Sequence, residues 1–223
     1  RRYYVSEEKI DLLLETCRNQ RFLTSVSAEN TAGVYIGIPF CPTRCLYCSF
    51  ASNQASGEAM ERYLQALLTE IEAVGAKFRS LGIVPESLYV GGGTPTSLSA
   101  FALERLLSCA VESFDLSEVR EFCVEAGRPD TITGEKLSVM RHYGVDRVSV
   151  NPQSMNDVTL KAIGRLHTVE EICRAFEMVR QSGIPHVNAD IIAGLPGEDY
   201  AMFLHTLKSV IALGPDNITV HTL

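Results

Sequence analysis

The sequence of 223 residues has no apolar run long enough to cross a membrane, so no membrane span is predicted. It has no block of lysine and arginine either. The 20 basic residues are outnumbered by 27 acidic ones, and the net charge of -7 argues against sequence-independent binding of nucleic acid. No glycine period is present and 46% of the residues are hydrophobic, which excludes collagen-like and disordered chains. No secretory signal precedes the cysteines, so a reducing, cytoplasmic compartment is expected.

The two ends of the sequence lead us to expect a piece of a longer protein. It opens on Arg1 without a methionine, and it stops at Leu223 directly after an apolar run. We expect residues 1–32 to be a helical lead-in that ends an upstream region, and residues 33–223 to form the core domain. A domain of that length can bury a large core of its own.

Short β-branched runs alternate with longer helical patterns after the lead-in. Strands are predicted over 34–38, 87–90, 121–124, 147–150, 187–193 and 217–220. Helices are predicted over about 58–79, 98–114, 133–142, from 157, over 169–181 and over 199–212. Left-handed glycine caps are expected after four of these helices, at Gly82, Gly144, Gly183 and Gly214. Strands separated by helices imply a parallel sheet, either doubly wound or closed into a complete or partial barrel.

Residues that can carry chemistry follow the strands in order. They are Cys41 after the first strand, the 91–95 glycine loop after the second, Glu125 after the third, Asn151-Pro152-Gln153 after the fourth, Asp190 within the fifth and His221 near the end of the sixth. Both candidate architectures bind ligands at the carboxyl ends of their strands. We therefore expect one functional site at this edge of the sheet.

Three of the seven cysteines stand close together, in the pattern C-x3-C-x2-C formed by Cys41, Cys45 and Cys48. Structural zinc sites normally need four ligands, and no fourth cysteine or histidine lies nearby in the sequence. A cubane iron–sulfur cluster has four irons, so ligation by three cysteines leaves one iron open for a ligand. The alternative, three buried apolar cysteines, is disfavoured by their spacing and by their position in a loop after a strand.

This cysteine pattern, with Tyr47 before its last member, resembles the radical S-adenosylmethionine (SAM) superfamily. The resemblance implies that Cys41, Cys45 and Cys48 hold a [4Fe–4S] cluster whose open iron is chelated by SAM. An electron, supplied by an unidentified donor, would pass from the cluster to SAM and release methionine and a 5′-deoxyadenosyl radical. The implied α/β fold is a partial (β/α)6 TIM-like barrel with parallel strands and the helices outside.

Four further motifs resemble those of the oxygen-independent coproporphyrinogen III oxidase family, which also includes haem chaperones. They lie at residues 35–41, 91–96, 163–168 and 190–197. The resemblance implies a set of SAM contacts, namely Tyr35, Gly92, Gly93, Thr94, Glu125, Gln153, Arg165, Asp190 and Ile192.

Within that set, residues 92–94 and Glu125 would face the amino-acid end of SAM, and Gln153 the ribose. Ile192 could pack on the adenine, and Arg165 is suited to the SAM carboxylate because its guanidinium is a fixed cation with forked donors. Without the resemblance, Tyr35 would be assigned to the core, and a solvated helix residue would be the alternative interpretation of Arg165.

The remaining histidines and cysteines are interpreted as structural. His167, His186 and His221 are expected to be hydrogen-bonded structural residues, although His221 could reach the rim of the site. Packing roles are expected for Cys17, Cys109, Cys123 and Cys173.

Two positions depart from the family pattern. Gly37 stands where the family usually has histidine, and Phe50 stands where the oxidases have a further cysteine. The phrases at 124–130 and 149–154 resemble a third branch, usually described as a coproporphyrinogen dehydrogenase paralogue. The C-terminal region that would cap the barrel and shape a tetrapyrrole pocket is absent from the sequence.

The first functional hypothesis is therefore an oxidoreductase of haem biosynthesis. The deoxyadenosyl radical would abstract hydrogen from a propionate of coproporphyrinogen III, and loss of carbon dioxide and an electron would leave a vinyl group, leading to protoporphyrinogen IX. A second hypothesis is a haem-binding chaperone that uses the same core for haem transfer. A third is a radical SAM enzyme for another substrate.

Overall fold

The computed structural model describes residues 5–24, 30–50 and 52–223. The chain divides into two compact units, Arg1–Thr31 and Ala32–Leu223. In the first unit, helix α1 covers Glu7–Thr24 and exposes Cys17, so the packing role predicted for Cys17 is wrong. The side chains of Leu13 and Leu14, which lie on the same helix face as Cys17, are exposed as well, so no described residue of this unit covers the thiol.

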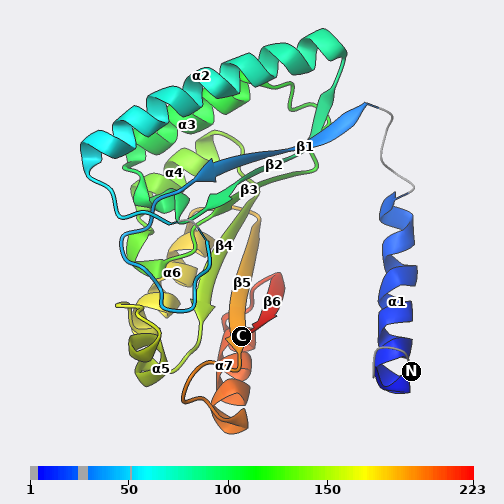
Figure 1. The fold of residues 1–223 in the computed structure, drawn as a ribbon, viewed down its shortest axis with the longest axis vertical. Helices are drawn as coiled ribbons and strands as arrows, with labels where there is room; N and C mark the ends of the chain where they lie inside the picture. Colours follow the sequence, from blue (N-terminus) through cyan, green and yellow to red (C-terminus); the bar gives the residue numbers. More distant parts are fainter. Residues whose placement is uncertain (1–4, 25–29, 51) are drawn as a thin grey trace. The chain divides into compact units, whose positions relative to one another are not determined.

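The second unit contains a six-stranded sheet in which the strands follow chain order from β1 to β6 (Figure 1). The strands are β1 (Thr31–Ile38), β2 (Val84–Gly92), β3 (Glu121–Glu125), β4 (Arg147–Gln153), β5 (His186–Ala193) and β6 (Asn217–Thr222). The sheet is open and its strands are parallel. This arrangement confirms the partial barrel, because a doubly wound sheet requires a reversal of strand order.

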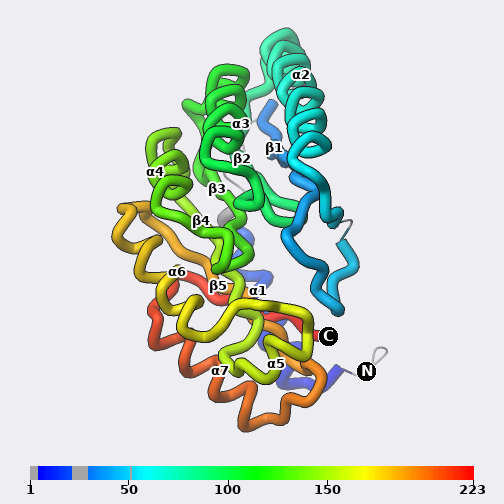
Figure 2. Tube along the Cα trace, turned by 90° about the vertical axis from the view of Figure 1, so that its left-hand side faces the viewer, coloured from blue at the N-terminus to red at the C-terminus, as the bar shows by residue number. Residues whose placement is uncertain are grey.

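The helices of this unit connect the strands, and α2, α3, α4 and α6 lie on the side that faces the viewer in Figure 2, with the strands behind them. Their bounds are α2 (Gly57–Leu81), α3 (Ala100–Ser113), α4 (Gly134–His142), α5 (Asp157–Ala162), α6 (Val169–Gln181) and α7 (Tyr200–Leu213). Two short 3₁₀ turns, η1 (Pro95–Ser97) and η2 (Pro129–Thr131), lie in the loops after β2 and β3. All four predicted glycine caps have positive φ, which confirms them: Gly82, Gly144, Gly183 and Gly214.

Helix α3 begins two residues later than the predicted start at 98. Ser99 is the N-cap, and its hydroxyl accepts a hydrogen bond from the backbone N–H of Ala102. The segment before it forms η1 instead, because Pro95 favours the tight turn that leads out of the glycine loop.

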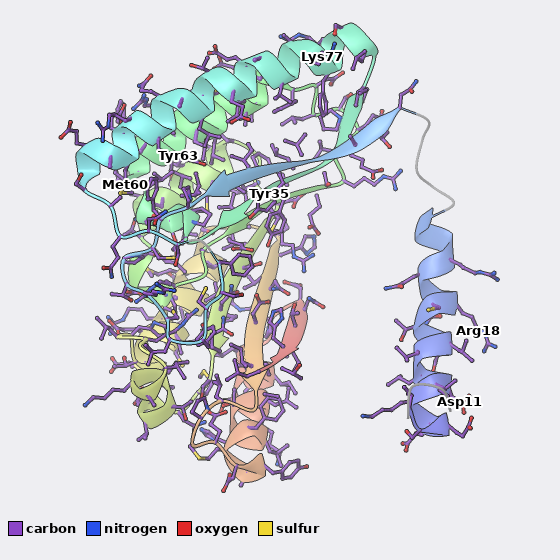
Figure 3. The ribbon with its side chains drawn as sticks, viewed as in Figure 1. Asp11, Arg18, Tyr35, Met60, Tyr63 and Lys77 are labelled. Carbon is purple, nitrogen blue, oxygen red and sulfur yellow. The ribbon has the colours of Figure 1, made fainter. Side chains whose placement is uncertain are left out.

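Helix α2 covers the edge strand β1. Tyr63 lies between the two elements and donates its hydroxyl to the carbonyl oxygen of Gly37 at 2.7 Å (Figure 3). The ring of Tyr63 also packs edge-to-face on Phe40, at 5.2 Å between ring centroids. Tyr35 is on the other face of β1, away from α2 (Figure 3), so helix packing holds one face of this strand and leaves the other to the site.

The core lies between the sheet and its helices, and Cys109 and Cys173 pack against it, as predicted. Cys123 is buried too, but on the opposite face of β3, where it lines a small cavity with Glu125 and Asp190. Among the residues that the structure describes, no helix is both long and apolar enough to cross a bilayer.

Candidate functional site

The carboxyl ends of the strands surround a cavity of about 680 Å³. Every metal-ligating or cofactor-binding residue predicted from the sequence lines this cavity: Cys41, Cys45, Cys48, Tyr35, Gly92, Gly93, Thr94, Glu125, Gln153, Arg165, Asp190 and Ile192. The structure thus brings together residues that are more than 150 positions apart in the sequence. The role of each one stays a prediction.

The cysteine loop is fixed by backbone hydrogen bonds at its base and at a point inside it. The N–H of Cys41 donates to the carbonyl oxygen of Asn53 at 3.1 Å, which closes the base of the loop. Inside the loop, the N–H of Leu46 donates to the carbonyl oxygen of Ile163 at 3.0 Å. The loop is therefore anchored to its own exit and to the segment after α5, and its thiols lie against one cavity wall.

The donor set suits a cluster better than a single ion. In the described ranges, no three His, Cys, Asp or Glu side chains converge closely enough to hold one metal ion. Cys41, Cys45 and Cys48 nevertheless line the same cavity. In a cubane each thiolate binds a different iron, so its cysteines are spread more widely than the ligands of a mononuclear zinc site. Soft thiolate ligands in this arrangement fit a [4Fe–4S] cluster.

The glycine loop after β2 runs alongside the chain that enters the cysteine loop. The N–H of Gly93 donates to the carbonyl oxygen of Ile38 at 2.8 Å, and the N–H of Thr94 donates to that of Phe40 at 2.7 Å. The Thr94 hydroxyl oxygen lies 3.2 Å from the sulfur of Cys41. These contacts couple the position of the first cysteine to the position of the glycine loop.

Close backbone approach explains why glycines stand at this point. Gly92 has a φ of 110°, and a Cβ there would lie 2.8 Å from the carbonyl oxygen of Ile38. A Cβ on Gly93 would lie 2.6 Å from the carbonyl oxygen of Phe40 and 3.0 Å from the sulfur of Cys41. A side chain at either position would push the glycine loop away from the cysteine loop.

Glu125, at the end of β3, is held by a tyrosine that the sequence reasoning missed. The Tyr89 hydroxyl donates to Oε1 of Glu125 at 2.5 Å, and the Tyr89 ring stacks on Tyr35 with 5.8 Å between centroids. Burial raises the pKa of Glu125, the Tyr89 hydroxyl opposes the rise, and the carboxylate of Asp190 adds to it. Tyr89 alone looks like an ordinary strand residue, and only its alternation onto the face that carries Glu125 could have indicated it.

Arg165 is buried, with 6% of its surface exposed, so the alternative of a solvated helix residue is excluded. Its Nη1 donates to the carbonyl oxygens of Gly127 and Asn151 at 3.0 and 2.7 Å. Its Nε and Nη2 donate to the Tyr47 hydroxyl at 3.2 and 3.1 Å. Burial raises the pKa of Tyr47 to about 12, although the charge of Arg165 lowers it, so the hydroxyl accepts these bonds as a neutral phenol. Within the described part of the chain, no carboxylate lies at ion-pair distance from Arg165.

The end of β4 is irregular where it enters the site. The register against β5 slips between Val150 and Gln153, and Gln153 has a φ of 67°, a conformation that non-glycine residues seldom adopt. Bulges and left-handed residues of this kind occur at functional sites, where the surrounding structure holds them in place. The side-chain oxygens of Asn151 and Gln153 are buried without a hydrogen-bond partner among the described residues.

The histidines behave differently from one another. His221 lines the cavity, as expected for the rim, and its Nε2 lies 3.7 Å from Oδ2 of Asp190. Asp190 also accepts a hydrogen bond of 2.7 Å from Asn188. His167 is fully buried, but neither ring nitrogen has a hydrogen-bond partner in the described ranges, contrary to the prediction. Its Nδ1 lies 3.7 Å from Oδ1 of Asp130, an oxygen that also accepts a hydrogen bond from Nε of Arg128.

Comparison with known proteins decides the family. The radical SAM superfamily profile matches residues 35–210. The chain belongs to the radical SAM superfamily. Members of this superfamily use a [4Fe–4S] cluster and SAM, and the residues that line the cavity fit both groups.

Two curated relatives indicate the group within the superfamily to which the chain belongs. It is 43% identical to the oxygen-independent coproporphyrinogen-III oxidase-like protein HemZ of Bacillus subtilis, over 99% of this chain and 45% of the relative. It is 34% identical to the heme chaperone HemW of Lactococcus lactis, over 85% of this chain and 48% of the relative. The chain thus spans about half the length of these curated relatives.

A solved structure confirms the resemblance to the coproporphyrinogen oxidases. The radical SAM enzyme HemN, the coproporphyrinogen III oxidase of Escherichia coli, superposes with a TM-score of 0.79 and 30% identity. The superposition covers 91% of this chain and 47% of HemN. This chain is therefore a radical SAM protein of the group that holds HemN, HemZ and HemW.

Proposed function

We propose that this protein is a radical SAM oxidoreductase that converts propionate side chains of coproporphyrinogen III to vinyl groups, leading to protoporphyrinogen IX. The observation that supports this most is the single cavity of about 680 Å³, lined by the three loop cysteines and by all of the predicted SAM contacts. The 43% identity to a coproporphyrinogen-III oxidase-like protein and the likeness to HemN favour this substrate class.

In this proposal Cys41, Cys45 and Cys48 hold the cluster. A cluster held there, once reduced by a separate electron donor, would supply the electron for cleavage of SAM to methionine and a hydrogen-abstracting 5′-deoxyadenosyl radical. The abstracted hydrogen leaves in 5′-deoxyadenosine, the carboxyl group leaves as carbon dioxide, and an acceptor takes the remaining electron. Ile192 is buried in the cavity wall and supplies an apolar surface for the adenine.

The polar residues orient SAM by its charged ends. Glu125 attracts the ammonium group, and the backbone at Gly92 and Gly93 approaches it closely because these two residues have no side chain. The buried guanidinium of Arg165 has no carboxylate partner among the described residues, and a buried cation of this kind requires an anion. We assign that anion to the carboxylate of SAM. The Gln153 amide faces the ribose.

Replacing Arg165 by methionine is expected to weaken SAM binding by about 10- to 100-fold, since hydrogen bonds to a charged group contribute about 1.5–3 kcal/mol. Calorimetric titration of the cluster-loaded protein with SAM measures the effect. Arg174→Met is the matched control, because Arg174 is an exposed helix residue that pairs with Glu170 at 3.0 Å on the surface. Equal affinity in Arg165→Met and wild type would remove Arg165 from the SAM site.

Replacing Tyr89 by phenylalanine is expected to weaken SAM binding by about 10-fold, because Glu125 loses a charge-assisted hydrogen bond. The hydroxyl lowers the pKa of Glu125, so its loss raises that pKa further above the ordinary value. Ammonium binding needs the ionised carboxylate. As the pH is lowered, the variant therefore loses affinity at a higher pH than the wild type does.

SAM titrations across a pH series test this shift, and Tyr200→Phe, on an exposed tyrosine, is the control. A Tyr89→Phe protein with wild-type affinity at every pH contradicts the proposed role of Glu125.

The substrate is tested by anaerobic assay of the protein with reconstituted cluster, SAM, a reductant and coproporphyrinogen III. The proposal expects vinyl-bearing product, carbon dioxide and 5′-deoxyadenosine. Deoxyadenosine without any vinyl product would retain the radical chemistry and exclude this substrate.

A haem chaperone is the second candidate function, and Phe50 favours it. This side chain is 68% exposed at the cavity, at the position where the oxidases have a further cysteine. The chain is also 34% identical to a heme chaperone. Stoichiometric haem binding without turnover of coproporphyrinogen III would support the chaperone and exclude the oxidase.

A further inference from the structure

Arg128, in the loop after β3, is a buried cation that contacts the cysteine loop. Its side chain is 2% exposed, and it lines the same cavity as the cysteines. Its Nη1 donates to the carbonyl oxygen of Thr43 at 3.4 Å and also to the Thr43 hydroxyl. Thr43 lies midway between Cys41 and Cys45. This contact therefore holds the segment between the two backbone hydrogen bonds that anchor the loop at Cys41 and Leu46.

Asp130 orients the guanidinium toward that loop. Nε and Nη2 of Arg128 donate to the two carboxylate oxygens of Asp130 at 3.0 and 2.9 Å, a bidentate pair that leaves Nη1 for Thr43. The positive end of the pair therefore faces the cysteines. Burial lowers the pKa of Arg128, but its interactions with Asp130, Cys45 and Cys41 raise it above the ordinary value.

A hydrogen-bond network behind Arg128 joins the loops after β2 and β3. Thr131 Oγ1 donates to the carbonyl oxygen of Arg128 at 2.8 Å and lies 2.6 Å from Thr96 Oγ1. The Lys136 ammonium donates to the carbonyl oxygens of Thr96 and Thr131 at 2.6 and 2.9 Å. With the Thr43 contact, three neighbouring strand-end loops are held as one unit, so Arg128 rests on a fixed base.

We propose that Arg128 is a positioning residue for the cysteine loop and that its charge raises the reduction potential of the cluster held there. A nearby positive charge stabilises the reduced cluster, which carries one more negative charge, and burial limits the screening of this interaction by solvent. The inference rests on the proposed function, because it requires a redox-active cluster on the three cysteines.

Two variants separate the effect of the Arg128 charge on the cluster potential from the effect of the Arg128 contact on the position of the cysteine loop. Arg128→Gln combined with Asp130→Asn removes the charged pair without leaving either charge buried alone. Thr43→Val removes one acceptor in the cysteine loop and leaves the charged pair in place. Arg105→Gln combined with Glu61→Gln is the matched control, because that pair joins α2 and α3 at 2.8 Å on the surface.

The cluster potential is measured by a redox titration followed by electron paramagnetic resonance, and loop order by the rate of thiol alkylation in the cluster-free protein. We expect a more negative potential in Arg128→Gln/Asp130→Asn and a nearly unchanged one in Thr43→Val and in the control. Faster alkylation of Cys41 and Cys45 is expected in both site variants. A mass-spectrometric readout assigns the rate to each cysteine.

An unchanged potential in a cluster-loaded Arg128→Gln/Asp130→Asn protein overturns the electrostatic role. Unchanged alkylation in both site variants overturns the positioning role. If the wild type assembles a cluster and cleaves SAM, an unchanged potential or unchanged alkylation in the variants counts against the role of Arg128 and leaves the proposed function intact. A wild type that assembles no cluster overturns the proposed function and this inference together.

Discussion

Cys41→Ala is expected to abolish reductive cleavage of SAM. Three thiolates are the whole protein ligand set proposed for the cluster, and Cys41 is the member whose sulfur also lies 3.2 Å from Thr94 in the glycine loop. The expected loss exceeds about 100-fold, since removal of even an outer-shell partner lowers metal affinity by about 10- to 100-fold. The variant should fold, because Cys41 is only partly buried.

Three measurements check this result: iron and sulfide content after anaerobic reconstitution, the paramagnetic signal of the reduced cluster, and the yield of 5′-deoxyadenosine. Cys17→Ala is the control, since Cys17 is an exposed cysteine on α1 and is outside the C-x3-C-x2-C pattern. A Cys41→Ala protein that keeps its cluster and cleaves SAM at the wild-type rate would show that the cluster assignment is wrong.

Gly93→Ala is expected to damage stability and cluster assembly together. The added Cβ would lie 2.6 Å from the carbonyl oxygen of Phe40 and 3.0 Å from the Cys41 sulfur, so backbone has to move. Overpacking of this kind lowers the free energy of unfolding by about 1–3 kcal/mol. The same movement displaces the first cysteine, so the variant should also incorporate less iron than the wild type.

Gly134→Ala is the matched control for this glycine. An added Cβ at Gly134 meets no atom within 4 Å, and the residue is exposed at the start of α4. Its stability should stay within about 0.5 kcal/mol of the wild type, as for most surface substitutions. Denaturant unfolding and iron content are measured on both variants. A Gly93→Ala protein as stable and as iron-rich as Gly134→Ala would contradict the close approach of the two loops.

Most of the site could be predicted because the fold is repetitive. Parallel strands in chain order bring their carboxyl ends to one edge, so residues such as Glu125 and Asp190 are neighbours as soon as each is placed after or within its strand. The cysteine spacing by itself predicts a cluster loop, because three thiols so close in sequence can serve one centre. Position along the chain was sufficient for these residues.

Residues that act through another side chain could not be found in this way. Tyr89 looks like a strand residue until its hydroxyl is seen 2.5 Å from Glu125. Arg128 lies in segment 124–130, which is notable in the sequence only for its resemblance to one branch of the family. Its contact with Thr43, 85 positions earlier, is seen only in the folded chain. Whether such polar atoms come within hydrogen-bond distance depends on how the loops are oriented relative to one another, and local sequence patterns do not specify that orientation.

The sequence by itself determined the alternation of strands and helices, through its periodicity, and indicated the radical SAM family, through the resemblance of its motifs. It also predicts which loop would hold a cluster, because the three cysteines are so close together. Only the tertiary structure decided which charges are buried together. It placed Arg165 in the cavity wall without a carboxylate partner and Arg128 against Asp130 beside the cysteines. Burial and pairing are properties of contacts between distant segments, so they exist only once the chain has folded.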